Sequence, residues 1–466
     1  MSIKVYSTLS RKKEDFLTVM PGKVRMYVCG PTVYAKAHVG HAMSALVFDI
    51  IRRYLEYSGY SVTHMMNFTD VDDKIISRAN QSGVDPKDLA EGYITEFKQN
   101  MADLNILPAT FNPRATQEID KIIEMVQGLI DKGFAYPVDG DVYFRVTRVA
   151  DYGKLSGRRL EDMQAGSRID VDERKEHPMD FALWKSARPE EPSWESPWGK
   201  GRPGWHIECS AMNLARMGEQ IDIHGGGNDL VFPHHENEIA QTESFTGKQF
   251  SRYWMHNGML QFGGEKMSKS IGNLINIEDF LSGHSADALR FMVLNSGYRN
   301  PLTFNDEVIG QAEKGLERLR SALRPALPGS KGAPTASLQT LAKQVEETRT
   351  AFKENMNDDF NTAGTLGSLF DLVRVTNQSR ADGATDAELK PTQDALYELI
   401  RVLGLVLEDK TSGSGASDGF IDLLLELRTE LRAQKNFTIG DKIRNRLNDL
   451  GVIIEDNKDG TTWRWQ

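Results

Sequence analysis

The feature that most constrains the fold is a strand, a break and a helix near the N-terminus. Residues 24–28 alternate in polarity and are rich in β-formers, and Cys29-Gly30-Pro31-Thr32 ends the run. Apolar residues recur at helical spacing from Ala42 to about Tyr57. This order predicts a strand that passes through a tight turn into a crossover helix.

A second strand and helix follow at once. Gly59 is expected to stop the first helix, residues 60–66 read as a strand, and Asp70 is expected to cap a helix through Ala79. A βαβα order favours a parallel sheet, whose ligands lie at the carboxyl ends of its strands. We therefore expect a doubly wound α/β domain with Cys29 and Thr69 at such ends.

Composition excludes several classes of protein. The chain has 466 residues, two cysteines and a net charge of −10, so a disulfide framework and binding of nucleic acid through bulk charge are both disfavoured. No apolar run approaches the ~20 residues of a membrane span, and the N-terminus lacks a secretory signal. We expect a soluble cytoplasmic protein of about three domains.

Shifts in composition predict how the chain is divided. Residues 133–204 contain a hairpin signal at Asp139-Gly140 and a stretch rich in Pro, Gly and Trp, and they read as an insertion. Residues 327–334 and 411–417 read as linkers, and a compact module with a helical start follows. The predicted divisions are a sheet domain (1–132 and 205–260), the insertion (133–204), a mainly helical region (261–328), a helical bundle (338–410) and a C-terminal module (418–466).

Four side chains suggest a metal site. Cys29 and Cys209 are the two cysteines, and His234 and Glu238 share a helix face if Pro233 opens a helix. Two thiolates, an imidazole and a carboxylate form a plausible tetrahedral zinc set. The alternative is that both cysteines are small buried apolar residues, and spacing alone leaves both interpretations open.

Other zinc signatures are incomplete. A metalloprotease helix would need a histidine at position 239, where Ile239 stands. A deaminase would need a Pro-Cys-x-x-Cys segment after His206-Ile207-Glu208, and none follows.

Two further motifs suggest phosphate binding. His38-Val39-Gly40-His41 lies where the first helix begins, and a helix N-terminus with two imidazoles suits a phosphate chain. Lys266-Met267-Ser268-Lys269-Ser270 follows two glycines and could clasp a triphosphate. Either motif alone is also typical of an ordinary surface turn.

As a pair, these motifs resemble the two signatures of class I aminoacyl-tRNA synthetases, with Val39 in place of the usual isoleucine. Within that class the chain is similar to the cysteine-specific members along its whole length, most strongly over residues 20–300. The segments that carry this likeness are Met26–Tyr34, Asn67–Lys74, Pro203–Ser210 and His224–Glu238.

The resemblance implies that cysteine and ATP form cysteinyl-adenylate and pyrophosphate, and that the cysteinyl group then moves to the 3′ end of tRNA(Cys). It implies a Rossmann-like catalytic domain, a stem-contact region at 261–328 and anticodon-binding domains at 338–410 and 418–466. It also implies Mg²⁺ with ATP, one Zn²⁺ per chain and a monomer. Cysteine and serine are near-isosteres that shape separates by roughly 10–200-fold, and zinc prefers the softer thiolate.

Residue roles follow from the same resemblance. The catalytic residues would be His38, His41, Lys266 and Lys269, and the ATP-binding residues Gly40, Gly226, Gly227, Asp229, Lys266, Ser268 and Lys269. Cysteine would contact Gly30, Thr69, Trp205 and His206, and zinc would be held firmly by Cys29, Cys209 and His234 and more weakly by Glu238. The tRNA would contact Arg432, Phe437, Asp441 and Asp456, with Phe437 where tryptophan is often found.

Two other functions stay open at this stage. A ligase that joins cysteine to an amino sugar would keep the zinc and ATP sites, although the Lys266–Ser270 motif and the C-terminal module favour tRNA. A non-catalytic tRNA-binding or zinc-binding paralogue is disfavoured because His38, His41, Lys266 and Lys269 are all present.

Overall fold

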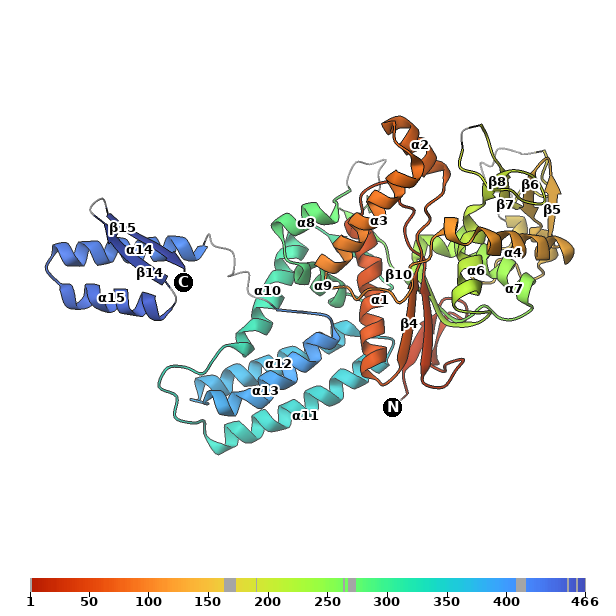
Figure 1. Ribbon diagram of the computed structural model, residues 1–466. Coiled ribbons are helices and arrows are strands. Elements are labelled where there is room, and N and C mark those ends of the chain that lie inside the picture. The colour runs from red at the N-terminus through yellow and green to blue at the C-terminus, as the bar shows by residue number, and fades with distance from the viewer. Residues whose placement is uncertain are drawn as a thin grey trace. The chain divides into compact units, whose positions relative to one another are not determined.

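The computed structural model divides the chain into two units, Met1–Val406 and Leu407–Gln466 (Figure 1). Among the residues it describes, no helix is both long and apolar enough to cross a membrane. The described residues are 2–162, 173–189, 191–262, 265–266, 274–407, 416–450, 452–457 and 460–465.

A four-stranded sheet with all neighbours parallel is the centre of the first unit. Its strands lie in the order β10-β9-β3-β4, and helix α1 (Val39–Tyr57) crosses from β3 to β4. The strand bounds are β3 Lys23–Val28, β4 Ser61–Met66, β9 Ile221–Gly227 and β10 Ser251–Asn257. After β3 the chain adds β4 on one side of it, and after β9 it adds β10 on the opposite side. The strand order therefore reverses between β3 and β9, and ligands of such sheets bind at this topological switch point.

Burial explains why these segments fold as they do. In β3, Val24, Met26, Tyr27 and Val28 are all buried, as expected for a parallel strand covered on both faces. The residues of α1 that recur at helical spacing, from Leu46 to Leu55, include its buried face. The predicted α/β parallel-sheet fold is confirmed.

The predicted helix cap at Asp70 is wrong. Helix α2 (Asp73–Ser82) is capped by Asp72, whose side chain accepts a hydrogen bond from the Lys74 amide at 2.8 Å. Asp70 instead accepts from the amide and hydroxyl of Thr116, at 3.0 and 2.6 Å. Asp70 is therefore engaged by a segment that lies 46 residues later in the chain.

Residues 135–203 contain an antiparallel sheet of four strands in the order β5-β6-β7-β8. Asp139 and Gly140 have φ of 49° and 87°, which suits the predicted tight hairpin turn. This sheet shares a hydrophobic core with the helices on either side of it in the chain. The bounds are α3 Pro86–Asp103, α4 Ile119–Asp131, β5 Ala135–Val138, β6 Asp141–Phe144, β7 Phe181–Ser186, β8 Gly201–Pro203, α6 Trp205–Arg216 and α7 Glu236–Thr246.

The rest of the first unit is mainly helical. A small sheet in the order β12-β11-β13 precedes a bundle of helices in the chain. The N-terminal hairpin of β1 (Lys4–Ser7) and β2 (Lys12–Asp15) is antiparallel. The remaining bounds are β11 Leu260–Phe262, β12 Glu265–Lys266, α8 Ile277–Gly283, α9 Ala286–Leu294, β13 Leu302–Phe304, α10 Asp306–Leu323, α11 Thr335–Asn357, α12 Thr362–Ala381 and α13 Asp386–Val402.

The second unit contains two helices and an antiparallel hairpin. These are α14 (Ala416–Ala433), α15 (Phe437–Asp449), β14 (Val452–Asn457) and β15 (Gly460–Trp465). The buried core residues are Ile421, Leu425, Leu447, Val452 and Ile454. The β-rich residues 452–454 thus form a strand, as the sequence predicts.

Candidate active site and metal centre

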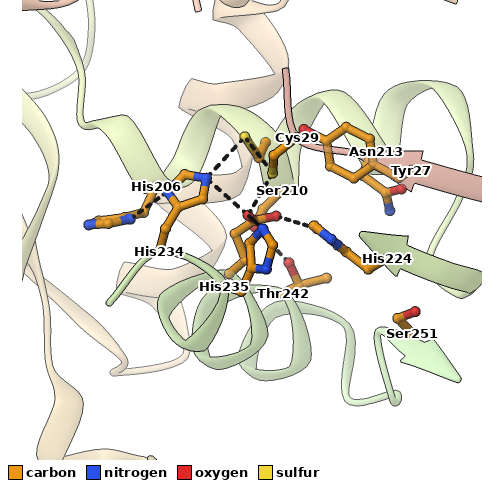
Figure 2. Close-up of polar contacts among 12 residues, drawn as sticks. Tyr27, Cys29, His206, Ser210, Asn213, His224, His234, His235, Thr242 and Ser251 are labelled. Carbon is orange, nitrogen blue, oxygen red and sulfur yellow. Dashed lines mark hydrogen bonds and ion pairs between the residues drawn. The ribbon is translucent and has the colours of Figure 1, made fainter. Parts of the chain in front are cut away.

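The carboxyl end of β3 brings Cys29 to the three other predicted metal ligands. Cys209 comes from α6, His234 from a short irregular helical segment (Val231–His235) and Glu238 from the first turn of α7. One donor atom from each of the four lies within 4.8 Å of every other. Figure 2 labels Cys29 and His234 of this cluster, with the neighbouring His206, His224 and His235.

Individual contacts within this cluster are short. Cys29 Sγ lies 3.8 Å from Cys209 Sγ and 3.4 Å from Glu238 Oε1. His234 Nε2 lies 3.5 Å from Cys209 Sγ and 3.1 Å from Glu238 Oε1. Pro233 does not open a regular helix, yet His234 and Glu238 still face each other across one turn.

Burial and charge set the protonation of the cluster. The hydrogen bond from Cys29 is the main cause that lowers the pKa of the Cys209 thiol to about 6. Burial opposes protonation of His234, but Cys209 and Glu238 outweigh it and raise its pKa to about 10. Burial raises the pKa of the Cys29 thiol. The cluster thus pairs a Cys209 thiolate and a Glu238 carboxylate with a protonated His234, and a cation that binds there would displace the proton from His234 Nε2.

The other nitrogen of His234 has a partner that suits a metal ligand. His234 Nδ1 lies 2.9 Å from His206 Nδ1, and burial lowers the pKa of His206 well below its usual range. A neutral His206 can accept the Nδ1 proton of His234, which leaves Nε2 directed at the cluster. Ligating histidines commonly hold their second nitrogen in this way.

Two histidines near the cluster were not predicted as site residues. His224, in the middle of β9, places Nε2 2.9 Å from Glu238 Oε2, and His235 Nδ1 lies 2.8 Å from His256 Nε2. Cys29, His224, His235 and Glu238 form a second group of donors within the same distance limit. The sequence feature that could have indicated them is that five of the ten histidines lie between positions 206 and 256.

The predicted cysteine-contact residues surround the cluster. Thr69 Oγ1 donates to Glu208 Oε2 at 2.9 Å. The Trp205 ring stacks on His234 with centroids 4.2 Å apart and stays 38% exposed. A Cβ at Gly30 would lie 1.7 Å from the carbonyl oxygen of Asn67, so only glycine fits there.

The two imidazoles of the first motif cap α1. His38 Nδ1 accepts from the Gly40 amide at 3.1 Å, and His41 Nδ1 accepts from the His38 amide at 3.3 Å. The rings stack with centroids 3.8 Å apart. Because each Nδ1 accepts, a neutral ring carries its proton on Nε2, where it can donate to an anion. A Cβ at Gly40 would lie 2.9 Å from His38 Nδ1, which explains the glycine.

The remaining ATP-motif residues are only partly described. Gly226 and Gly227 end β9, and a Cβ at Gly226 would lie 2.9 Å from His235 Cε1. A Cβ at Gly227 would lie 2.6 Å from Asp229 Oδ1. Lys266 has its main chain on β12, whereas Ser268 and Lys269 lie outside the described residues.

The predicted tRNA-contact residues lie in the second unit. Arg432 lies 3.3 Å from Asp441, and its guanidinium is 5.8 Å from the centroid of the Phe437 ring. Phe437 is 51% exposed. Asp456 lies on β14, and its side chain is outside the described residues.

Comparisons with known proteins agree with this geometry. Residues 15–314 match the family described as tRNA synthetases class I (C) catalytic domain, and residues 351–408 match the DALR domain. A cysteine--tRNA ligase of Dehalococcoides mccartyi is 54% identical over 466 residues, which is 99% of each chain. One from Brevibacillus brevis is 49% identical over the whole of both chains.

Solved structures share the fold at low identity. Methionyl-tRNA synthetase of Mycobacterium tuberculosis with methionyl-adenylate has a TM-score of 0.58 at 16% identity, over 82% of this chain and 90% of that one. A ternary complex of an Agrobacterium radiobacter LeuRS has a TM-score of 0.61 at 11% identity, over 84% and 85%. From the family match and the full-length relatives, the chain belongs to the class I aminoacyl-tRNA synthetases, in the family of the cysteine--tRNA ligases.

Proposed function

We propose that this chain joins L-cysteine to tRNA(Cys) in two steps. The cysteine carboxylate attacks the α-phosphorus of ATP and pyrophosphate leaves; the 3′-terminal ribose hydroxyl of the tRNA then attacks the cysteinyl carbonyl and AMP leaves. The relatives extend along the whole chain, including the second unit, which supports tRNA rather than an amino sugar as the acceptor.

The observation that carries the proposal is the convergence of Cys29, Cys209, His234 and Glu238 at the switch point of the sheet. Two sulfurs, one nitrogen and one carboxylate oxygen are a donor set that fits Zn²⁺. A zinc ion bound there would prefer the thiolate of cysteine over the hydroxyl of serine. Cys29, Cys209 and His234 would hold it firmly.

Glu238 is the proposed weaker ligand. His224 binds one of its oxygens at 2.9 Å, so the carboxylate has a partner to retain when a substrate thiolate approaches. Trp205 would cover that thiolate, and its stacking on His234 and partial exposure support this role. Gly30, Thr69 and His206 complete the proposed cysteine pocket.

The residues of α1 act on the phosphates in this proposal. The carboxylate of cysteine is ionised at neutral pH, so the enzyme has to align it and to stabilise charge on the leaving pyrophosphate. His38 and His41 present Nε2 donors at a helix N-terminus, and Lys266 and Lys269 would add positive charge. The adenosine of ATP, with Mg²⁺ on its phosphates, would lie along Gly40, Gly226, Gly227 and Asp229, with Ser268 nearby.

The finer divisions are part of the same proposal. The sheet domain would catalyse both steps, residues 261–328 would contact the acceptor stem, and residues 338–410 and 418–466 would bind the anticodon side. Arg432, Phe437, Asp441 and Asp456 are the proposed contacts. We place the enzyme in the cytoplasm as a monomer.

Charging of total tRNA with labelled cysteine tests the proposal. The assay is run beside labelled serine and beside protein stripped of metal with a chelator and reloaded with zinc. We expect cysteine-specific charging that is lost on chelation and restored by zinc. Cysteine-dependent pyrophosphate exchange without charging would instead indicate a small-molecule acceptor, and equal use of serine would refute selection by the metal.

A further inference from the structure

The connection between α11 and α12 has an unusual backbone. Asp359 and Phe360 are consecutive non-glycine residues in the left-handed region, with φ of 61° and 52°. That region is disfavoured for a bulky residue such as phenylalanine. Such a conformation persists where the surroundings hold it in place, and it is often found at functional positions.

The Asp359 carboxylate is the centre of those surroundings. It is buried, and its Oδ1 accepts from the Tyr6 amide at 2.8 Å and from the Tyr298 hydroxyl at 2.9 Å. Its Oδ2 accepts from Arg299 Nε at 3.2 Å. A buried carboxylate is costly unless its partners are all in place, so this one holds the N-terminal strand and the segment after α9 against the same turn.

The turn also contacts α1, the helix that begins at His38. Tyr54 of α1 donates its hydroxyl to Asn357 Oδ1 at 2.8 Å, and its ring meets Phe360 edge-on with centroids 6.1 Å apart. The Asp359 amide donates to the Lys4 carbonyl at 2.9 Å. One short turn of the bundle therefore contacts α1, β1 and the segment after α9.

Backbone contacts continue from Tyr298 to Lys266. The Gly258 amide donates to the Tyr298 carbonyl at 2.8 Å, and a Cβ at Gly258 would lie 2.0 Å from the Asn300 carbonyl oxygen. From there β13 pairs with β11, and β11 pairs with β12, where Lys266 lies opposite Gln261. Main-chain pairing thus links the partner of Asp359 to the strand of a proposed ATP-binding lysine.

We propose that Asp359 is a positioning residue for adenylate formation: through Tyr298 and Arg299 it fixes the sheet β12-β11-β13 to the helical bundle, and so sets where Lys266 stands relative to α1. The inference rests on the proposed function, since it assigns Lys266 to ATP.

The test compares Asp359→Asn with Asp358→Asn in the full chain. Asp358 is the adjacent control: its side chain is 56% exposed and pairs with Lys13. Cysteine-dependent pyrophosphate exchange is measured without tRNA, together with zinc content. For Asp359→Asn we expect kcat to fall by about ten- to a hundredfold, with zinc content and the KM for cysteine unchanged. Asp358→Asn should stay within about twofold of the unmodified chain.

A merely structural role would give a different result. In that case Asp359→Asn lowers the melting temperature, but kcat measured well below that temperature equals that of the unmodified chain, and the inference is overturned. If Asp359→Asn does not fold, Tyr298→Phe removes one donor to the same carboxylate, and an unchanged kcat for this variant overturns the inference as well. If both fold, the double variant should be no slower than Asp359→Asn alone, whereas additive losses would refute a shared path.

Assays of the unmodified chain distinguish failure of the proposed function from failure of the positioning role. Absence of cysteine-dependent exchange in the zinc-loaded chain would refute the proposed function and this role with it. Normal exchange in the unmodified chain and in Asp359→Asn would refute only the positioning role.

Discussion

The metal cluster and the C-terminal contact residues come from one family resemblance, but they have opposite surroundings. Cys209, His234 and Glu238 are at most 2% exposed, whereas the side chains of Arg432 and Asp441 are 40% and 61% exposed. A buried polar group must be paired, so several neighbours determine its position. An exposed ion pair contributes little to the stability of the fold. Substitutions should therefore have large, specific effects in the cluster and small ones at the C-terminal surface.

The largest effect is expected from Cys209→Ser. The substitution replaces a soft sulfur donor by a hydroxyl in a set that contains only one other sulfur, so zinc content and cysteine-dependent pyrophosphate exchange should both fall by more than about a hundredfold. Atomic absorption after dialysis and the exchange assay measure the two quantities. Glu219→Gln, at an exposed pair with Lys248, is the control, and a Cys209→Ser chain with full zinc and normal exchange would contradict the assignment.

The next effect concerns His224, which the sequence did not single out. His224→Asn removes the partner of Glu238 Oε2 and should weaken zinc binding by about ten- to a hundredfold, as measured against a competing chelator. His284→Asn is a matched control, because His284 also contacts a glutamate at 2.9 Å but is partly exposed. Equal zinc affinity in the two variants would show that the contact of His224 with Glu238 does not support zinc binding.

A third prediction uses His64, a buried histidine away from the cluster. Neither ring nitrogen has a hydrogen-bond partner among the described residues, and burial lowers its pKa to about 4. As pH falls from 6.5 towards 4, the unfolded chain binds a proton that the folded chain does not, so stability falls. The cost at pH 5 is about 2 kcal/mol.

Replacing His64 by leucine removes this titration. The loss in the free energy of unfolding between pH 8 and pH 5 should then be about 2 kcal/mol smaller than in the unmodified chain. Urea unfolding followed by circular dichroism at both pH values measures it. The same pH dependence in both proteins would mean that His64 does not titrate in this range.

The smallest effect is expected from Arg432→Gln. The exposed contact with Asp441 should matter little for folding, so the melting temperature should change by no more than about 1 °C. Loss of one positive charge at a proposed tRNA contact should raise the KM for tRNA about threefold and make the salt dependence less steep, with pyrophosphate exchange unchanged. An Arg432→Gln chain that binds tRNA normally at all salt concentrations would remove Arg432 from the proposed contacts.

Local patterns predicted the elements well where one periodicity dominates, as in β3 and α1. They failed at Asp70, because Asp70 and Asp72 are equally good caps by local chemistry. The tertiary structure distinguishes them, because the Thr116 hydroxyl donates a hydrogen bond to the Asp70 carboxylate and leaves Asp72 to cap the helix. The same limit explains why His224 was missed, because the sequence of a strand does not show which carboxylate one of its histidines will contact.

Residue types and spacing alone were enough to indicate a parallel-sheet domain. They also suggested a zinc set and two phosphate motifs, which the family resemblance of the paired motifs then favoured over ordinary surface turns and buried cysteines. Packing decided which donors meet: Cys29 and Cys209 are 180 residues apart in the chain yet have sulfurs 3.8 Å apart. Packing also gave Glu238 Oε2 its partner His224 and Asp359 its three donors. The periodicity of apolar residues indicates which face of a helix or strand is buried. Which side chains of distant elements come into contact depends on how those faces pack, and only the folded structure shows this.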